Sequence, residues 1–65
     1  DEVVKILQRI IDGPFTSEKK SKARTQLAAL RGELISDIGG TRKPVLDINI
    51  LQELGVPITL ASQVL

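Results

Sequence analysis

Few residues of this chain could carry out chemistry, because it contains no His, Cys, Met, Trp or Tyr. Carboxylates, amines and hydroxyls remain. Glu33 and Asp37 stand four residues apart, a spacing that would place both carboxylates on one face of a helix. Catalysis by a carboxylate pair would need matching acids on a second element, and no other segment supplies them. We therefore interpret these two residues as part of a solvated helix face.

The stretch GGTRK, residues 39–43, invites comparison with loops that cradle phosphate groups. It lacks the spacing of a P-loop and the helix start that follows one, so we interpret it as a helix stop followed by a basic turn. The absence of His and Cys also removes the usual ligands of zinc, haem and iron–sulfur clusters. The sequence thus predicts a protein that is not an enzyme, with no cofactor and no metal site.

The first element that the sequence predicts is a helix over residues 1–12. Its apolar residues recur at steps of three and four, which is the helical pattern, and Gly13 and Pro14 mark its end. These apolar residues are Val3, Val4, Ile6, Leu7, Ile10 and Ile11. The short connection through Pro14 predicts an antiparallel helical hairpin with the next element.

A second amphipathic helix of about twenty residues is predicted to start at Thr16 or Ser17 and to end at Gly39-Gly40. Gly32 would weaken its middle by up to about 1 kcal/mol relative to alanine. Its apolar stripe consists of Ala23, Leu27, Leu30, Leu34 and Ile38, and its opposite face carries Lys19, Lys20, Lys22, Arg24 and Arg31.

Apolar residues are concentrated after Pro44, where they make up 12 of 21 positions against 15 of the 44 before. A short helix over residues 47–54, closed by Gly55, and another from Pro57 to the end are the simplest reading. Alternation at period two, in 46–50 and 56–60, leaves short strands as the alternative. The predicted fold class is all-α, a single small domain over residues 1–65 with an N-terminal helical hairpin and two short C-terminal helices.

Residues 50–64 resemble the helix-turn-helix of bacterial repressors. Gly55 matches the turn glycine and Val56 the apolar residue after it, while Ile50, Leu54, Ala61 and Val64 match positions where the helices pack. The resemblance implies DNA binding, with Thr59, Ser62 and Gln63 at base edges and Arg42 and Lys43 on the backbone. The sequence departs from the family pattern at Leu51, where the family usually keeps a small residue, and it has no Lys or Arg within the motif.

Residues 45–65 also look like part of the N-terminal helical module of transcription elongation factor S-II and elongin A. The similarity is carried by Ile50-Leu51, Val56-Pro57-Ile58-Thr59 and Val64-Leu65. It implies a protein partner, and no functional residue is carried over from it.

The apolar content after Pro44 exceeds what two short elements can bury against a helical hairpin, and exposed aliphatic surface marks protein contacts. We expect Ile58, Leu60, Val64 and Leu65 to face a protein partner or a second copy. The predicted function is a non-enzymatic interaction or oligomerisation module, with a helix-turn-helix DNA-binding domain as the alternative.

The net charge is +1, and no apolar run approaches the length of a membrane span. We therefore expect a soluble protein without membrane contact, and the lack of cysteine favours the cytoplasm. A chain that begins with Asp and ends on Val64-Leu65 is predicted to be a fragment, or a subunit of a larger assembly.

Overall fold

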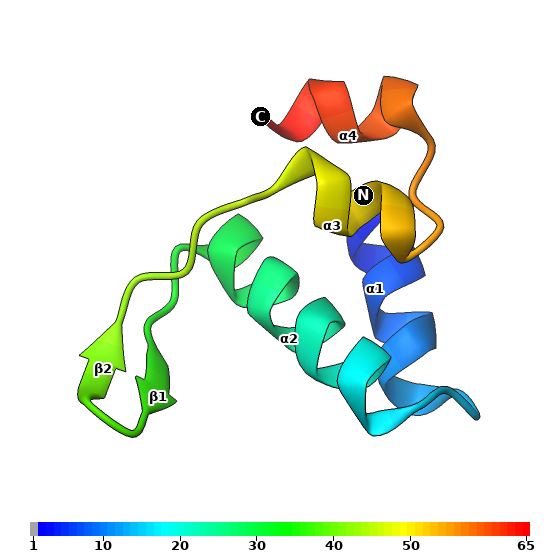
Figure 1. The fold of residues 1–65 in the computed structure, drawn as a ribbon. Coiled ribbons are helices and arrows are strands. Elements are labelled where there is room, and N and C mark those ends of the chain that lie inside the picture. The colour runs from blue at the N-terminus through cyan, green and yellow to red at the C-terminus, as the bar shows by residue number, and fades with distance from the viewer. Residues whose placement is uncertain (1) are drawn as a thin grey trace.

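The computed structural model describes residues 2–65, which form a small helical bundle with a short two-stranded sheet (Figure 1). Asp1, placed in the first helix by the sequence, lies outside the described residues. In chain order the elements are α1 (Glu2–Asp12), α2 (Ser17–Arg31), β1 (Ile35–Asp37), β2 (Gly40–Arg42), α3 (Ile48–Glu53) and α4 (Ile58–Val64).

Helices α1 and α2 form the helical hairpin that the sequence predicts. They meet at the loop of residues 13–16 and diverge from it (Figure 1). Thr16 caps α2, because its side-chain oxygen accepts a hydrogen bond from the Lys19 backbone N–H at 3.2 Å. The apolar face of α1 is buried at Val3, Leu7 and Ile10. It packs with Ala23 and Leu27 of α2 in the hydrophobic core.

The two short helices after Pro44 complete this core, so helices rather than strands occupy the C-terminal segment. The side chain of Asp47 accepts a hydrogen bond from the backbone N–H of Asn49 at 2.9 Å and thereby caps α3. Leu51 of α3 and Ala61 of α4 are fully buried in the common core. The alternative of short strands, suggested by the period-two alternation, is wrong, because residues 48–53 and 58–64 form helices. Residues two apart do not share a helix face, and Ile58 is accordingly exposed while Leu60 is partly buried.

The second helix is shorter than the sequence predicts. It ends at Arg31, where Gly32 adopts a left-handed conformation with φ of 68° and its N–H bonds the carbonyls of Ala28 and Ala29. This is a glycine C-cap, a common way for a helix to end. The predicted stripe therefore stops at Leu30, and Leu34 and Ile38 lie outside the helix on the exposed surface.

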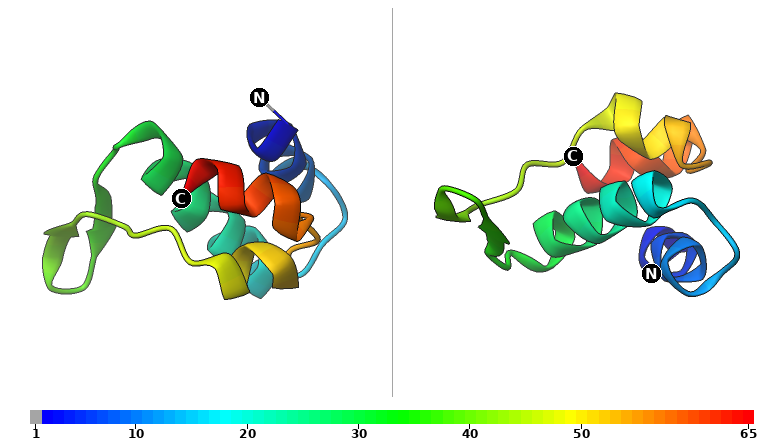
Figure 2. Two further views of the ribbon diagram at one scale, coloured as in Figure 1. Left: turned by 90° about the horizontal axis from the view of Figure 1, so that it is seen from above. Right: turned by 60° about the horizontal axis from the view of Figure 1, so that its bottom comes forward.

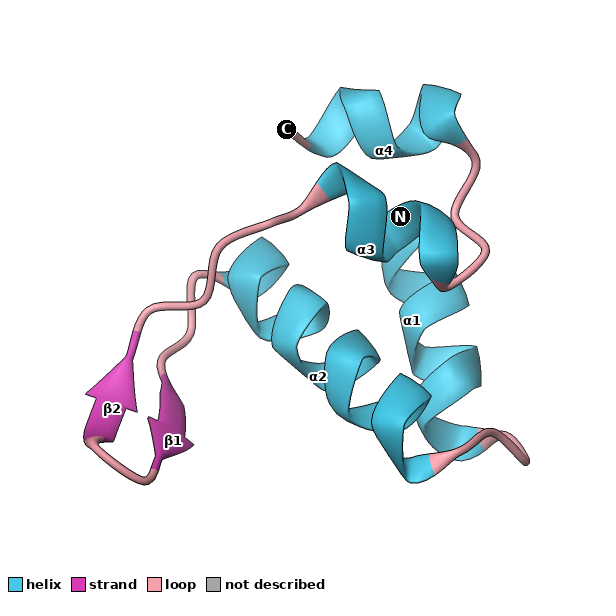
Figure 3. Ribbon diagram, viewed as in Figure 1, coloured by secondary structure: helices cyan, strands magenta, loops and turns pink. Residues whose placement is uncertain are grey.

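The segment expected to be the last helical turn and a basic turn is instead an antiparallel hairpin of β1 and β2 (Figure 3). Asp37 pairs with Gly40, so Ile38 and Gly39 form the turn, while Ile35 pairs with Arg42. The hairpin projects to one side of the helices in every view (Figures 1 and 2). The all-α prediction is correct for the bundle and wrong for this hairpin.

None of the helices within residues 2–65 is long and apolar enough to cross a lipid bilayer.

Replacing Gly32 with alanine should lower the free energy of unfolding by about 1–2 kcal/mol, because an L-residue is strained in the left-handed region. A methyl group there meets no atom within 4 Å, so the loss would come from the backbone alone. Urea-induced unfolding measures this change in the free energy of unfolding. Gly39→Ala is the matched control, since Gly39 has no positive φ and equally open space. Equal losses in the two variants would contradict the assignment of Gly32 as the cap.

Candidate interaction surfaces

Gln26 of α2 binds the segment that connects the β-hairpin to α3. Its polar side chain is buried, with 1 % exposed. Its Oε1 accepts a hydrogen bond from the backbone N–H of Asp47 at 2.9 Å, and its Nε2 donates one to the carbonyl of Val45 at 3.4 Å. Both ends of the amide are thus satisfied by the backbone of one segment, which places the start of α3 against α2.

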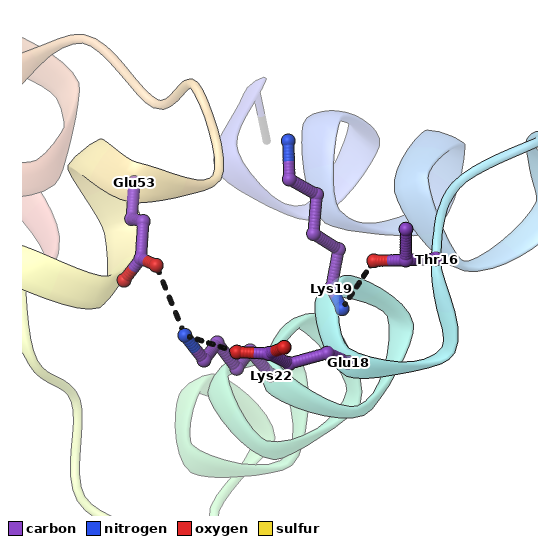
Figure 4. A network of polar contacts seen from close by, with 5 residues as sticks. All are labelled: Thr16, Glu18, Lys19, Lys22 and Glu53. Carbon is purple, nitrogen blue, oxygen red and sulfur yellow. Dashed lines mark hydrogen bonds and ion pairs between the residues drawn. The ribbon is translucent and has the colours of Figure 1, made fainter.

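An ion pair reinforces the same contact between α2 and α3. Lys22 Nζ lies 3.0 Å from Oε1 of Glu53 on α3 and 3.4 Å from Oε1 of Glu18, which is one turn earlier on α2 (Figure 4). The hydrogen bond to Glu53 raises the pKa of Lys22 above its ordinary value. The pKa of Lys22 is therefore higher in the folded chain than in the unfolded chain. The ion pair stabilises the fold fully at pH values below the ordinary lysine pKa, and this stabilisation is lost as the pH rises through the raised pKa.

The exposed side of α4, together with Leu65 directly after the helix, combines two large aliphatic residues with three polar ones, and we call this surface the α4 face. Ile58 and Leu65 are 59 % and 61 % exposed. Ile58 is the first residue of α4, and Leu65 directly follows its last residue. The polar members, all exposed, are Thr59, Ser62 and Gln63.

Of the four predicted partner-binding residues, the structure exposes Ile58 and Leu65 and places the other two differently. Leu60 and Val64 are partly buried and pack against the hydrophobic core. Ala61, between them, is fully buried. These residues attach α4 to the bundle.

The two basic residues proposed for DNA binding are not on the α4 face. Arg42 ends β2, and Lys43 follows it on the way back to the bundle; both are exposed. The hairpin that carries them projects away from the helices (Figure 2). The structure does not gather Arg42 and Lys43 with Thr59, Ser62 and Gln63 into one surface.

A second apolar surface lies on the hairpin and its two connections, residues 33–45, which we call the arm. Leu34 is 64 % exposed, Val45 is 77 % exposed, and Ile38 at the turn is fully exposed. Sequence reasoning missed this surface because it assigned Leu34 and Ile38 to a buried helical stripe. The sequence does contain a signal for this surface. Gly32 can end a helix before these residues, and Gly39-Gly40 can form the turn of a hairpin.

The arm also separates the acids that were considered as a carboxylate pair. Glu33 precedes β1 and Asp37 belongs to it, so the two do not share a helix face. Among the side chains that the structure describes, no cluster of three or more Asp and Glu residues could hold a metal ion. The described part of the chain also has no pocket.

No family model, curated protein or solved structure matches this chain.

Gln26→Leu keeps the size of the side chain but removes both hydrogen bonds, leaving the Asp47 N–H and the Val45 carbonyl without these partners. We expect a loss of about 1–3 kcal/mol in the free energy of unfolding, since the two hydrogen bonds are partly buried and a hydrogen bond contributes about 0.5–1.5 kcal/mol. Thermal or urea unfolding followed by circular dichroism gives the value. Gln8→Leu, at an exposed site of α1, is the control. A Gln26→Leu variant as stable as Gln8→Leu would show that these hydrogen bonds do not hold α3.

Proposed function

We propose that this protein is a non-enzymatic protein-interaction module whose α4 face contacts another protein. The observation that carries the proposal is the exposure of Ile58 at the start of α4 and of Leu65 directly after its end, in a segment that has no charged residue. The centres of protein–protein interfaces are depleted of charged side chains and bury large apolar ones. The α4 face has this composition.

The way α4 is attached supports the same function. Leu60, Ala61 and Val64 anchor the inner side of the helix to the core. Ile58 and Leu65 are not needed for that packing, and leaving both in water forgoes apolar burial worth about 1.5–3 kcal/mol for each fully buried side chain. A partner that covers them recovers this free energy. A segment that is already folded as a helix also loses less conformational entropy on binding than a disordered one.

DNA binding through α4 is the second candidate, and one observation favours it. Thr59, Ser62 and Gln63 are all exposed on the same helix, after a turn in which Gly55 has φ of 96°. Hydroxyl and amide groups of this kind hydrogen-bond to base edges. Phosphate contacts supply most of the non-specific affinity for DNA, however, and residues 44–65 contain no Lys or Arg. The protein-interaction function is therefore the better supported one.

The proposed contact is tested by placing a photo-crosslinking amino acid at Ser62, between Ile58 and Leu65 on the exposed side of α4. In cells that make the protein naturally, we expect a crosslinked product of discrete mass in which a second protein is identified by mass spectrometry. The double variant Ile58→Ser with Leu65→Ser should abolish that product, because it removes the aliphatic contact while leaving the buried side of α4 intact.

The same crosslinker at Gln8, exposed on α1, serves as the control position and should not give the product. If Ser62 and Gln8 crosslink to the same proteins, or if the product survives the double substitution in a folded variant, the α4 face is not the contact.

For the DNA alternative, we expect no stable complex with a short duplex in sedimentation experiments at low salt. A complex that forms at about 50 mM salt, weakens steeply by 200 mM, and is lost in Gln63→Ala would favour DNA binding over the proposed function. Ser17→Ala, outside the predicted recognition residues, controls for non-specific effects of substitution.

A further inference from the structure

The arm is an extended segment that projects from the folded bundle. It leaves the helices in all three views, and its two strands are three residues each (Figures 1 and 2). An isolated two-stranded hairpin is at best marginally stable in water, so the arm opens more easily than the core. Exposed turns of this kind are preferred sites of proteolytic cleavage, because they can enter an active site while the rest of the protein stays folded.

The second strand of the arm presents its backbone to solvent. All three residues of β2, Gly40–Arg42, are exposed, and so is Lys43 after them. Within the part of the chain that the structure describes, β2 pairs with β1 alone, so its other edge runs along solvent. Extended peptides are commonly bound as an added strand, through main-chain hydrogen bonds. Residues 40–43 already have the conformation that this mode of binding requires.

Three peptide bonds that follow a basic residue lie in the arm or beside it, and the structure distinguishes them. The Arg31–Gly32 bond belongs to the cap of α2, where its N–H donates hydrogen bonds to two helix carbonyls. The Lys43–Pro44 bond joins a proline that is buried and has no N–H. The Arg42–Lys43 bond joins two exposed residues at the end of β2. The remaining basic residues lie within α1 and α2: Lys5, Arg9, Lys19, Lys20, Lys22 and Arg24.

We propose that the Arg42–Lys43 peptide bond is a cleavage site for proteases of trypsin-like specificity, which bind a basic side chain directly before the bond that they cut. Water is the other reactant. Its oxygen is added to the carbonyl carbon of Arg42, the C–N bond breaks, and the products are a carboxylate on Arg42 and an amine on Lys43. This site is separate from the α4 face and does not depend on the function proposed for that face.

The two pieces of the cleaved chain stay together, because the contacts that hold α3 lie beyond the cut. Gln26 hydrogen-bonds to the backbone of Val45 and Asp47, and Lys22 pairs with Glu53 at 3.0 Å. Buried side chains of α3 and α4 also belong to the common core. Cleavage therefore replaces the covalent link between α2 and α3 with a non-covalent one, so dilution releases the piece that carries the α4 face.

Limited digestion of the whole chain with trypsin, followed by mass spectrometry, tests this inference. We expect the first products to be residues 1–42 and 43–65, and we expect them to elute together at the size of the intact chain under native conditions. Arg42→Gln should slow the first cut about tenfold or more, because a bond inside a helix is reached only when that helix opens. Arg24→Gln, at an exposed site of α2, is the matched control and should leave the rate unchanged.

A first cut after Arg31 or within either long helix would overturn the proposal, and so would an Arg42→Gln variant that is cut as fast as the original chain. A chain that trypsin leaves intact until it is unfolded with urea would overturn it as well. Both substitutions are at exposed residues, so the circular dichroism spectra of the two variants should match that of the original chain. Pieces that separate as soon as the bond is cut would contradict the retained complex.

Discussion

The two hydrogen bonds of the Gln26 side chain are the interaction on which the rest of this small structure depends. A buried amide must find partners for both its oxygen and its nitrogen, and Gln26 finds them in the backbone of Val45 and Asp47. Because these groups belong to the segment that leads into α3, the side chain determines where that segment meets α2. The cap of α3 by Asp47 begins at the same point.

Two consequences follow from this attachment. On one side, α3 and α4 are brought over the hairpin of α1 and α2, so that Leu51, Leu54, Val56 and Ala61 close a core made entirely of aliphatic side chains. On the other side, the arm is left outside that core, and of its residues Pro44 is buried. A chain with a single aromatic residue thus obtains a closed core by excluding about a fifth of its residues from it.

The sequence predicts the parts of this fold that depend on local signals. Apolar spacing and end signals identify α1 correctly, and Gly55 and Pro57 place α3 and α4 to within a residue or two. It does not predict the arm, because Leu34 and Ile38 continue the helical spacing of α2 and only the left-handed conformation of Gly32 interrupts it. The role of Gln26 is also invisible in the sequence, since both of its hydrogen bonds join residues about twenty positions apart. At the candidate surface Ile58 and Leu65 are exposed, whereas Leu60 and Val64 pack against the core, and this difference depends on how α4 packs on the bundle.

The central claim of this account is that Gln26 fixes the segment entering α3 to the bundle and leaves the arm outside it. Amide hydrogen exchange measured by NMR on dilute protein tests this claim directly. The Asp47 amide should be protected to a degree comparable with core amides such as that of Leu51, while the Thr41 amide in β2 should exchange orders of magnitude faster through local opening. An Asp47 amide that exchanges as fast as that of Thr41 would contradict the claim.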